Sequence, residues 1–335
     1  MNLNDKIKKV KEILTDKKTA IAFSGGADST LIAYLSSKVS KDTLAITVNN
    51  NLMPKGFINH TKNITDSFGI KHEIINIDFY SNREFLLNNA QRCYNCRKEM
   101  YENIKKTALT NGFDFICDGN NISDLVIDRP GILVTYNMDF KTPLIKAKLS
   151  SKEIHEYLNE NNIPYSRSTT CLATRIPKDT IITRKKIEKI KQSENYIQNS
   201  TNCRIIKVRD INNHAICEVD YPEEILKNSR YVKINNELKK YGFEKIALNL
   251  SALNDDEHIN IHYQNNSFSF QLPFTINLKD TAEQLKISDT DNKIELDNII
   301  IYENGFIEGN NFKTYNHAMD KFMEILPKIR RNIIR

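Results

Sequence analysis

The first half of the chain alternates between short apolar runs and stretches with helical spacing. The runs TAIAF (19–23) and TLAITV (43–48) flank one such helical stretch, and apolar runs return at 72–79 and 113–121. Strands that are joined through helices lie parallel in one sheet. The pattern therefore predicts an α/β fold with a doubly wound parallel sheet, in a first domain that we set at residues 1–183.

A smaller α+β domain is expected at residues 184–254. Its hairpin would turn at Asn212–Asn213, because this pair separates two alternating apolar runs and asparagine tolerates the left-handed backbone of a tight turn. The pattern predicts, in order, a lysine-rich helix at 184–199, the hairpin at 204–220, one helix at 221–242 and a strand at 244–250.

Beyond residue 254 the composition becomes rich in asparagine and acidic residues. The stretch INIHYQNNSFSFQL (259–272) alternates around Asn265–Asn266 and predicts a second hairpin. An amphipathic helix is expected at 317–334. We assign residues 255–335 to an appended C-terminal α+β region, whose role the sequence does not indicate.

The composition narrows the class of protein. Hydrophobic residues make up 40% of the chain and charged residues 27%, and no apolar run reaches the length that spans a bilayer. The lysine-rich start, MNLNDKIKKVKEIL, lacks the apolar core and the small-residue cleavage site of a signal peptide. We therefore expect this stretch to form the first helix of a cytoplasmic protein that makes no membrane contact.

The positive charge is concentrated in the first 250 residues. The whole chain carries a formal charge of +6, whereas residues 251–335 hold 9 Lys and Arg against 13 Asp and Glu, which leaves +10 on the rest. This surplus suits an anionic ligand such as a nucleotide, although solvated surface lysines explain it equally well. A nucleic-acid partner is not favoured, because the chain has no arginine-rich arm with interleaved aromatic residues.

The first candidate site is the stretch SGGADS, which follows a predicted strand and opens a predicted helix. Gly25 and Gly26 allow the backbone to turn tightly, so that its N–H groups can approach a ligand. The helix N-terminus adds partial positive charge, and Ser24 and Ser29 add hydroxyl donors. Asp28 would repel a phosphate unless Mg²⁺ lay between the two. The stretch therefore predicts a phosphate site that needs a metal ion.

Two common phosphate-binding motifs are excluded at this turn. No lysine follows the glycines, as it would in the G-x-x-x-x-G-K-[ST] loop, and the spacing is not G-x-G-x-x-G. A plain strand–helix turn, with Asp and Ser as capping residues, is the alternative interpretation. The run AFSGGADST resembles the PP-loop signature S-G-G-x-D-S of the ATP pyrophosphatase superfamily. That resemblance implies an adenine nucleotide alpha hydrolase-like fold, which cleaves ATP between its α and β phosphates and transfers AMP to a substrate oxygen.

The second candidate site consists of cysteines. Cys93 and Cys96 form a C-x-x-C pair on a predicted helix, and Cys171 lies in a loop flanked by Arg167 and Arg175. Nearby guanidinium groups are expected to lower the pKa of the Cys171 thiol and favour its reactive form. The remaining three cysteines fall in apolar strands or beside them and are expected to be buried and structural: Cys117, Cys203 and Cys217.

The pair alone fits several kinds of chemistry. It could be a redox couple, half of a zinc site or part of an iron–sulfur site. Two thiols do not complete a zinc site, and no nearby H-x-x-x-H pattern supplies further ligands. Three thiolates could hold three irons of a [4Fe–4S] cluster, and the fourth iron would stay open to an extra sulfur.

Larger motifs resemble one family of the superfamily. CLATRIPKDTIIT and RCYNCRKEMY, together with DGNNISD, DRPG and KVRDINNHAICEV, are similar in order and content to the LarE family over about residues 5–250. These ATP-dependent sulfur transferases act in nickel-pincer cofactor biosynthesis. The resemblance implies that a pyridinium carboxylate mononucleotide is adenylated and converted to a thiocarboxylate. It also implies a homo-oligomer and, for repeated turnover, a sulfur donor.

The resemblance also implies roles for individual residues. In one branch of the family the cysteine that matches Cys171 gives up its sulfur and becomes dehydroalanine. In another branch three cysteines, here Cys93, Cys96 and Cys171, hold a [4Fe–4S] cluster that relays sulfide, and this chain has all three. The following residues match substrate-binding or catalytic positions: Arg129, Arg175 and Arg209 as substrate-binding arginines, and Glu218 as an acidic catalytic residue alongside Cys171 and Arg175.

The chain departs from the family in three ways. Ala173-Thr174 stands where the family has a small residue and Ser before its loop arginine, Lys178-Asp179 replaces a common Tyr-Gly, and the chain continues past the usual end. Two other enzyme types therefore stay open. One is a tRNA thiolase with the same turn and a cluster, and the other is an amide-forming synthetase like those that make NAD or GMP. A protein that binds ATP without turnover is a third alternative.

Overall fold

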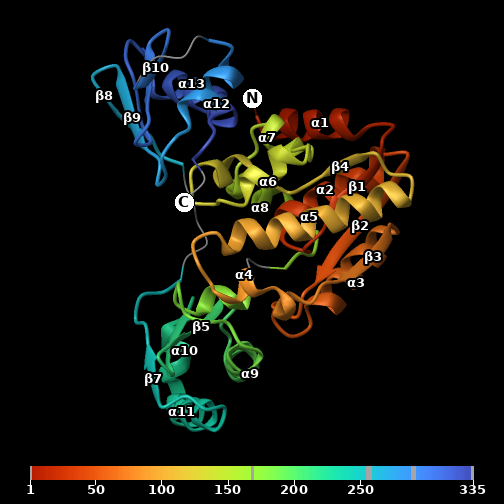
Figure 1. Cartoon of the computed structure of the whole chain (residues 1–335), viewed down its shortest axis with the longest axis vertical. Helices are drawn as coiled ribbons and strands as arrows, with labels where there is room; N and C mark the ends of the chain where they lie inside the picture. Colours follow the sequence, from red (N-terminus) through yellow and green to blue (C-terminus); the bar gives the residue numbers. More distant parts are fainter. Residues whose placement is uncertain (1, 167–169, 254–258, 288–291, 333–335) are drawn as a thin grey trace.

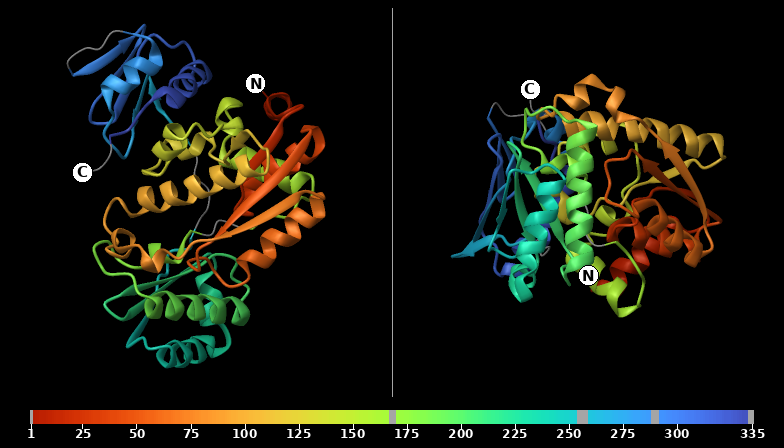
Figure 2. Two further views of the ribbon diagram at one scale, coloured as in Figure 1. Left: turned by 45° about the vertical axis from the view of Figure 1, so that its right-hand side comes forward. Right: turned by 90° about the horizontal axis from the view of Figure 1, so that it is seen from below.

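The described part of the chain contains three β-sheets, which Figure 1 shows in a computed structural model of the protein. The domain with the first sheet lies in the middle, and the other two sheets lie at opposite ends of it, as the left view of Figure 2 also shows. The predicted domain limits stay predictions, and the limit between residues 254 and 255 lies outside the described residues. The structure describes residues 2–166, 170–253, 259–287 and 292–332.

The first sheet is parallel and has the strand order β3-β2-β1-β4. This confirms the predicted doubly wound α/β fold. The order reverses at β1, which lies between β2 and β4, and ligands of such sheets bind where the order reverses, at the carboxyl ends of the strands. The strands are β1 (Lys18–Ala22), β2 (Asp42–Asn49), β3 (Lys71–Asn76) and β4 (Phe115–Cys117).

Helices cover both faces of this sheet because alternate residues of its strands point to opposite sides. Ala20 of β1 belongs to the apolar core beneath α5 (Arg92–Thr110), whereas Ile21 belongs to the core formed with α1 (Leu3–Leu14) and α2 (Ala27–Val39). The remaining helical segments of this domain are α3 (Phe57–Phe68), η1 (Phe79–Ser81), α4 (Arg83–Leu86), η2 (Ile122–Leu125), α6 (Ile132–Asn137), α7 (Pro143–Lys146), α8 (Ser151–Glu160) and η3 (Leu172–Arg175).

The second sheet confirms the predicted hairpin. Asn212 and Asn213 both have positive φ, 49° and 69°, as the tight turn requires. The first two strands are antiparallel, and the third pairs parallel to the second. The sheet contains β5 (Ile206–Ile211), β6 (His214–Val219) and β7 (Lys245–Leu248), and α9 (Arg184–Ser200) packs on β5.

The single helix predicted at 221–242 is wrong, because the chain bends in its middle. Asn228 and Ser229 have left-handed backbone angles, with φ of 53° and 55°, which a continuous α-helix does not accommodate. The stretch therefore forms three pieces, namely α10 (Pro222–Leu226), η4 (Lys227–Ser229) and α11 (Arg230–Lys240).

The third sheet has five antiparallel strands in the order β10-β11-β12-β9-β8. Its β8–β9 hairpin turns at Asn265–Asn266 as predicted, whereas the strands from β10 to β12 were not predicted. The elements are β8 (His262–Gln264), β9 (Ser267–Gln271), α12 (Leu278–Leu285), β10 (Lys293–Leu296), β11 (Ile299–Tyr302), β12 (Phe306–Gly309), α13 (Tyr315–Ile325) and η5 (Leu326–Lys328).

The final helix is shorter than the predicted 317–334. Helix α13 ends at Ile325, and Pro327 lies just beyond it in a short 3₁₀ turn. Proline lacks the N–H that a continuing helix needs, and its ring crowds the preceding turn. Residues 329–332 are therefore free to pair with other segments. Within the described residues, no helix has both the length and the apolar character needed to cross a membrane.

The buried face of α1 gives a prediction for stability. Leu14 is fully buried and Lys9 on the same helix is exposed. We expect Leu14→Ala to lower the free energy of unfolding of the first domain by about 2–5 kcal/mol, because it leaves a cavity against the sheet, and Lys9→Ala to change it by less than about 0.5 kcal/mol. Urea unfolding followed by circular dichroism measures both values. Equal midpoints for the two variants would mean that α1 does not pack as described.

Candidate functional site

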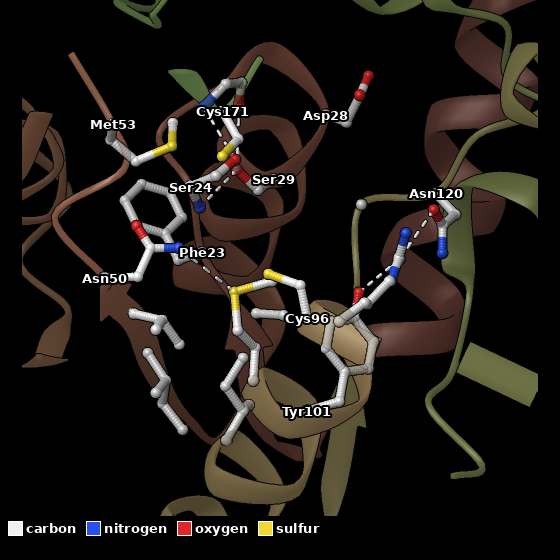
Figure 3. Close-up of a pocket in the computed structure, with 18 of the residues that line it drawn as sticks. Phe23, Ser24, Asp28, Ser29, Asn50, Met53, Cys96, Tyr101, Asn120 and Cys171 are labelled. Atoms are coloured by element: carbon white, nitrogen blue, oxygen red, sulfur yellow. Dashed lines mark hydrogen bonds between the residues drawn. The ribbon is translucent and has the colours of Figure 1, made fainter. Parts of the chain in front are cut away.

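A cavity of about 350 Å³ lies at the carboxyl ends of β1 and β4 (Figure 3). It is therefore located where the strand order of the parallel sheet reverses. The SGGADS turn forms one wall, and α5 contributes Cys96, Arg97 and Tyr101 to the other. Residues from far apart in the sequence meet here, since Gly119, Asp124 and Cys171 also line the cavity.

The turn before α2 leaves N–H groups open to a ligand. Gly25 has a φ of 71°, and a Cβ atom at this residue would lie 3.1 Å from the Thr61 side chain, so glycine is required on both counts. Gly26 occupies the N-cap position of α2 and has no side chain to cap the helix, while its own N–H donates to Ser24 Oγ at 3.4 Å. The first N–H groups of the helix therefore remain available to an anion.

The two serines of the turn face each other. Their Oγ atoms lie 3.2 Å apart, and Ser29 Oγ also accepts a hydrogen bond from the Ser24 N–H at 3.2 Å. Ser29 Oγ donates to the Gly26 carbonyl oxygen at 3.2 Å. The hydroxyl groups are thus held at the mouth of the turn, where they can donate to a phosphate oxygen.

Gly119 at the end of β4 was not singled out from the sequence as a site residue. A Cβ atom at this position would lie 2.8 Å from the backbone nitrogen of Ser29 and 3.0 Å from Cβ of Asp28. Only glycine lets β4 approach the turn so closely. Its position in the motif DGNNISD was the available signal, but the partner that crowds it is 90 residues earlier in the chain.

Two carboxylates share the cavity. Burial and the nearby Asp124 raise the pKa of Asp28 to about 7, although Asn121 donates a hydrogen bond of 3.1 Å to Asp28 Oδ1 and lowers it. Burial also raises the pKa of Asp124. A divalent cation between these two carboxylates would stabilise the ionised form of both. Carboxylate oxygens are also the type of ligand that Mg²⁺ prefers. The predicted magnesium role of Asp28 therefore has a second carboxylate beside it.

Arg129 supplies the nearest compensating charge. Its guanidinium forms an ion pair with Asp124, and the residue also lines the cavity. Its side chain is 45% exposed, so one edge of the guanidinium can still turn towards an incoming phosphate. Among the predicted substrate-binding arginines, Arg129 is the one that lines this cavity.

The opposite part of the cavity is apolar. Such a surface suits a flat heteroaromatic ring, while the polar turn suits phosphate. The apolar residues come from the end of β1 and the residue after it, from β2, from the start of α3 and the segment before it, and from α5: Ala22, Phe23, Ile46, Val48, Met53, Phe57, Met100 and Ile104.

The three cysteines predicted to act together are gathered at the cavity, but unequally. Cys96 and Cys171 both line it (Figure 3), whereas Cys93 lies one turn away at the start of α5 and is exposed. No group of three or more His, Cys, Asp or Glu side chains in the described ranges is close enough to hold a metal ion. The three thiols would therefore have to shift before they could share one cluster.

The expected low pKa of Cys171 is wrong in direction. Burial raises the pKa of its thiol, and the hydrogen bond from the Ala173 backbone and the charges of Arg92 and Arg175 only partly oppose this effect. Burial likewise raises the pKa of Cys96. Desolvation of a thiolate thus outweighs the nearby guanidinium groups. Arg167, the other flanking arginine, lies outside the described residues.

The loop that carries Cys171, residues 170–183, is here called the thiol loop. Arg92 at the start of α5 and Asn88 just before this helix both contact it, and neither residue was predicted. The Asn88 side chain donates to the Pro177 carbonyl oxygen at 2.7 Å, and Arg92 donates to the Ala173 carbonyl oxygen at 3.1 Å. The Arg92 guanidinium also lies 3.3 Å from the Cys93 sulfur. Arg92 therefore contacts both thiol-bearing segments. Its place directly before the C-x-x-C pair was the only signal in the sequence.

Arg175 does not line the cavity. Its guanidinium is buried and donates to Glu194 Oε1 at 2.7 Å, and it also donates to the hydroxyl groups of Thr170 and Thr174. Burial raises the pKa of Glu194, while Arg175 lowers it. This pair joins the thiol loop to α9, so the observed contact of Arg175 is structural, and its predicted substrate and catalytic roles stay predictions.

Arg209 and Glu218 lie on neighbouring strands and contact each other. Arg209 Nε donates to Glu218 Oε1 at 2.9 Å, and Arg209 Nη1 donates to the Thr174 carbonyl oxygen at 3.2 Å. Neither residue lines the cavity. Their roles in substrate binding and catalysis also stay predictions, while the contact with Thr174 ties the small sheet to the thiol loop.

The other three cysteines are buried, as predicted. Cys117, Cys203 and Cys217 are at most 5% exposed, and none of the six cysteines, all of which are described, is in a disulfide. Among the six thiols, only the three near the cavity are therefore exposed or partly exposed.

Comparisons with known proteins agree with this site. The PP-loop domain family matches residues 1–127. An uncharacterized protein of Methanocaldococcus jannaschii is 30% identical over 241 residues, which cover 72% of this chain and 92% of the relative. The pyridinium-3,5-bisthiocarboxylic acid mononucleotide synthase of Lactiplantibacillus plantarum is 23% identical over 245 residues, or 70% of this chain and 87% of that enzyme.

A shorter match points to a second branch. A tRNA-specific 2-thiouridylase of Fusobacterium nucleatum is 40% identical over 62 residues, 18% of either chain. The matched PP-loop domain contains the strand–turn–helix at residues 18–39. The chain belongs to the PP-loop ATP pyrophosphatase family, in which it is similar to the LarE-type synthase.

Proposed function

We propose that this protein is an ATP-dependent sulfur transferase that converts the carboxylate of a pyridinium mononucleotide into a thiocarboxylate. One observation carries the proposal: the PP-loop turn and two thiols, Cys96 and Cys171, line the same cavity. An adenylating site and a sulfur source must meet at one acyl carbon. The similarity to the pyridinium-3,5-bisthiocarboxylic acid mononucleotide synthase supports this substrate class.

The first step is adenylation. The apolar part of the cavity would take the adenine ring, and the turn at residues 24–29 would take the phosphates. Asp28 and Asp124 would hold Mg²⁺, which neutralises phosphate charge when bound. A carboxylate oxygen of the substrate attacks the α-phosphorus, the bond to the bridging oxygen breaks, and pyrophosphate leaves. Positioning and charge neutralisation supply the catalysis.

The second step is sulfur transfer. The Cys171 thiol loses its proton, its sulfur attacks the acyl carbon, and AMP leaves with the electron pair of the cleaved C–O bond. Removal of the Cα proton of Cys171 then breaks its Cβ–S bond. The products are a thiocarboxylate and a dehydroalanine at position 171, so this route turns over once.

A [4Fe–4S] cluster would permit repeated turnover. Thiols are suitable ligands for such a cluster, and Cys96 and Cys171 line the cavity while Cys93 lies one turn away on α5, although these three are not close enough in the described structure to hold a metal ion together. Cys93, Cys96 and Cys171 would hold such a cluster, which supplies an open iron for a transferable sulfide when bound. A sulfur donor and a homo-oligomeric assembly belong to the same proposal.

Transfer of sulfur to tRNA is the second candidate. The match to a tRNA-specific 2-thiouridylase and the net charge of +10 on residues 1–250 favour it. An amide-forming synthetase ranks last, because it leaves the gathered thiols without a role. A tRNA-binding measurement at several salt concentrations separates the first two candidates. The tRNA route requires tRNA binding that weakens with salt, whereas the mononucleotide route requires no tRNA binding.

The sulfur source gives the decisive test. With ATP and a pyridinium dicarboxylate mononucleotide, we expect pyrophosphate release and a product in which one oxygen is replaced by sulfur. Cys171→Ala should still release pyrophosphate but form no thiocarboxylate, because only the second step needs this sulfur. Mass spectrometry of product and protein, with Cys203→Ala as the control, checks both steps. Thiocarboxylate formation by Cys171→Ala at the wild-type rate would exclude the proposed role.

The carboxylate at the turn gives a pH prediction. The pKa of Asp28 is raised from 3.8 to about 7, so folding is increasingly disfavoured as the pH rises between these values, because the unfolded chain loses the proton first. Asp28→Asn should therefore raise the Tm of the free protein more at pH 8 than at pH 5, and should weaken Mg·ATP binding by roughly 10- to 100-fold. Calorimetry measures both effects.

The exposed Asp114 provides the control for this pH prediction. We expect Asp114→Asn to change neither the Tm difference nor the affinity for Mg·ATP. Unchanged Mg·ATP affinity in Asp28→Asn would remove the magnesium role.

The cluster is tested by metal analysis after anaerobic purification and reconstitution. We expect about four irons and acid-labile sulfide per chain in the wild type, and loss of both in Cys93→Ala with ATP binding retained. Cys203→Ala should keep its iron. Full iron content in Cys93→Ala would refute the three-thiolate cluster, whereas a wild type that stays free of iron after reconstitution would leave Cys171 as the sole sulfur source.

A further inference from the structure

We propose that the C-terminal unit, here residues 259–332 as far as they are described, is a positioning element for the ATP site, and that Arg331 is its contact residue. This inference rests on the proposed function only for the identity of the nucleotide in the cavity. The relatives compared above cover at most 72% of the chain, and the PP-loop domain match ends at residue 127.

Arg331 reaches from the third sheet to the first domain. Its Nη1 donates to Asp128 Oδ1 at 2.5 Å, across 203 residues of sequence. The Arg331 side chain is only 3% exposed, and its guanidinium stacks on the Phe274 ring at 4.8 Å. Loss of this carboxylate would leave the buried charge of Arg331 without a partner, which would destabilise the folded protein. The ion pair therefore holds Asp128 in position.

The backbone around Arg331 is held in place. Residue Ile276 pairs with Arg331 in an antiparallel bridge, and the Asn332 N–H donates to the Thr275 carbonyl oxygen at 2.9 Å. The neighbouring Arg330 lies over the Tyr136 ring of α6, 4.0 Å from its centre. Residues 329–332, which follow η5, therefore form a fixed connection between the first domain and the C-terminal unit.

The contact is anchored in a shared apolar core. Residues of the first domain that follow β4 pack together with the C-terminal helix and its 3₁₀ turn, rather than only touching them at the surface. The buried members of this core include Ile122, Leu125, Ile132 and Ile145 from the first domain and Phe322, Ile325, Leu326 and Ile329 from the C-terminal unit. Such a core excludes a loosely tethered domain.

Asp128 directly precedes Arg129, whose guanidinium pairs with Asp124 at the ATP cavity. A small cavity of about 20 Å³ marks this junction: Asp124 and Arg129 line it from one side, and Phe274 and Arg331 from the other. A shift of Asp128 would therefore move the guanidinium of Arg129. Arg331 acts on the phosphate site through the turn that contains both residues.

The test compares Arg331→Met with Lys313→Met, an exposed lysine on the same unit, in the full-length protein. We expect Arg331→Met to bind Mg·ATP about 3- to 30-fold more weakly, with unchanged affinity for adenosine, because Arg129 acts on the phosphates. Lys313→Met should match the wild type for both ligands. Calorimetric titration measures these affinities.

Amide hydrogen exchange in residues 124–133 provides a readout that needs no ligand. It should speed up in Arg331→Met and in Asp128→Asn, whose half-exposed carboxylate can be altered even where the arginine variant fails to fold. If exchange is faster in the variants but the wild type binds no ATP, the proposed function is overturned and the positioning role of the Arg331–Asp128 contact is retained. Unchanged exchange and unchanged ATP affinity in both variants would overturn this inference.

Discussion

Carboxylates crowd the carboxyl end of the parallel sheet, and the surrounding structure is arranged around their charge. Asp118 pairs with Arg97 at 3.0 Å, and Asp124 pairs with Arg129. Asp28 forms no such ion pair with the described residues, and burial, followed by the nearby Asp124, raises its pKa to about 7. Like charges in a partly buried site are tolerated only when cations are close. The missing positive charge at Asp28 is the reason to expect a metal ion there, together with the nucleotide that carries it.

A different balance governs the thiols. Burial keeps Cys96 and Cys171 protonated despite the guanidinium of Arg92 nearby, so neither is a ready nucleophile in this state. Positive charge brought among them would favour the thiolates. The thiol loop is also tied to three separate elements, through Asn88, Arg175 and Arg209. Movement of this loop is therefore coupled to both the ATP-binding domain and the small sheet.

The sequence allowed prediction of those features that are encoded locally. The turn at Gly25–Gly26 and both Asn-Asn hairpins depend on neighbours within a few residues, and all are present. The parallel sheet pairs distant strands, but it was predictable because apolar runs alternate along the chain with helical stretches. Contacts between distant segments were not predictable. Gly119 must lack a side chain because the backbone of Ser29 lies against it. The guanidinium of Arg175 forms an ion pair with Glu194, and no local pattern in the sequence indicates this partner. The bend at Asn228–Ser229 was hidden because the flanking residues keep helical spacing.

The separation of Asp128 and Arg331 along the chain has a consequence for biosynthesis. Domains made first begin to fold while the rest of the chain is still being synthesised. The parallel sheet and its turn are complete long before residue 331 leaves the ribosome, because 203 residues separate the two partners. During that interval the first domain would be folded but would lack the contact between Asp128 and Arg331. Synthesis itself would thus set the order of events, with the phosphate site maturing only after the last sheet has formed.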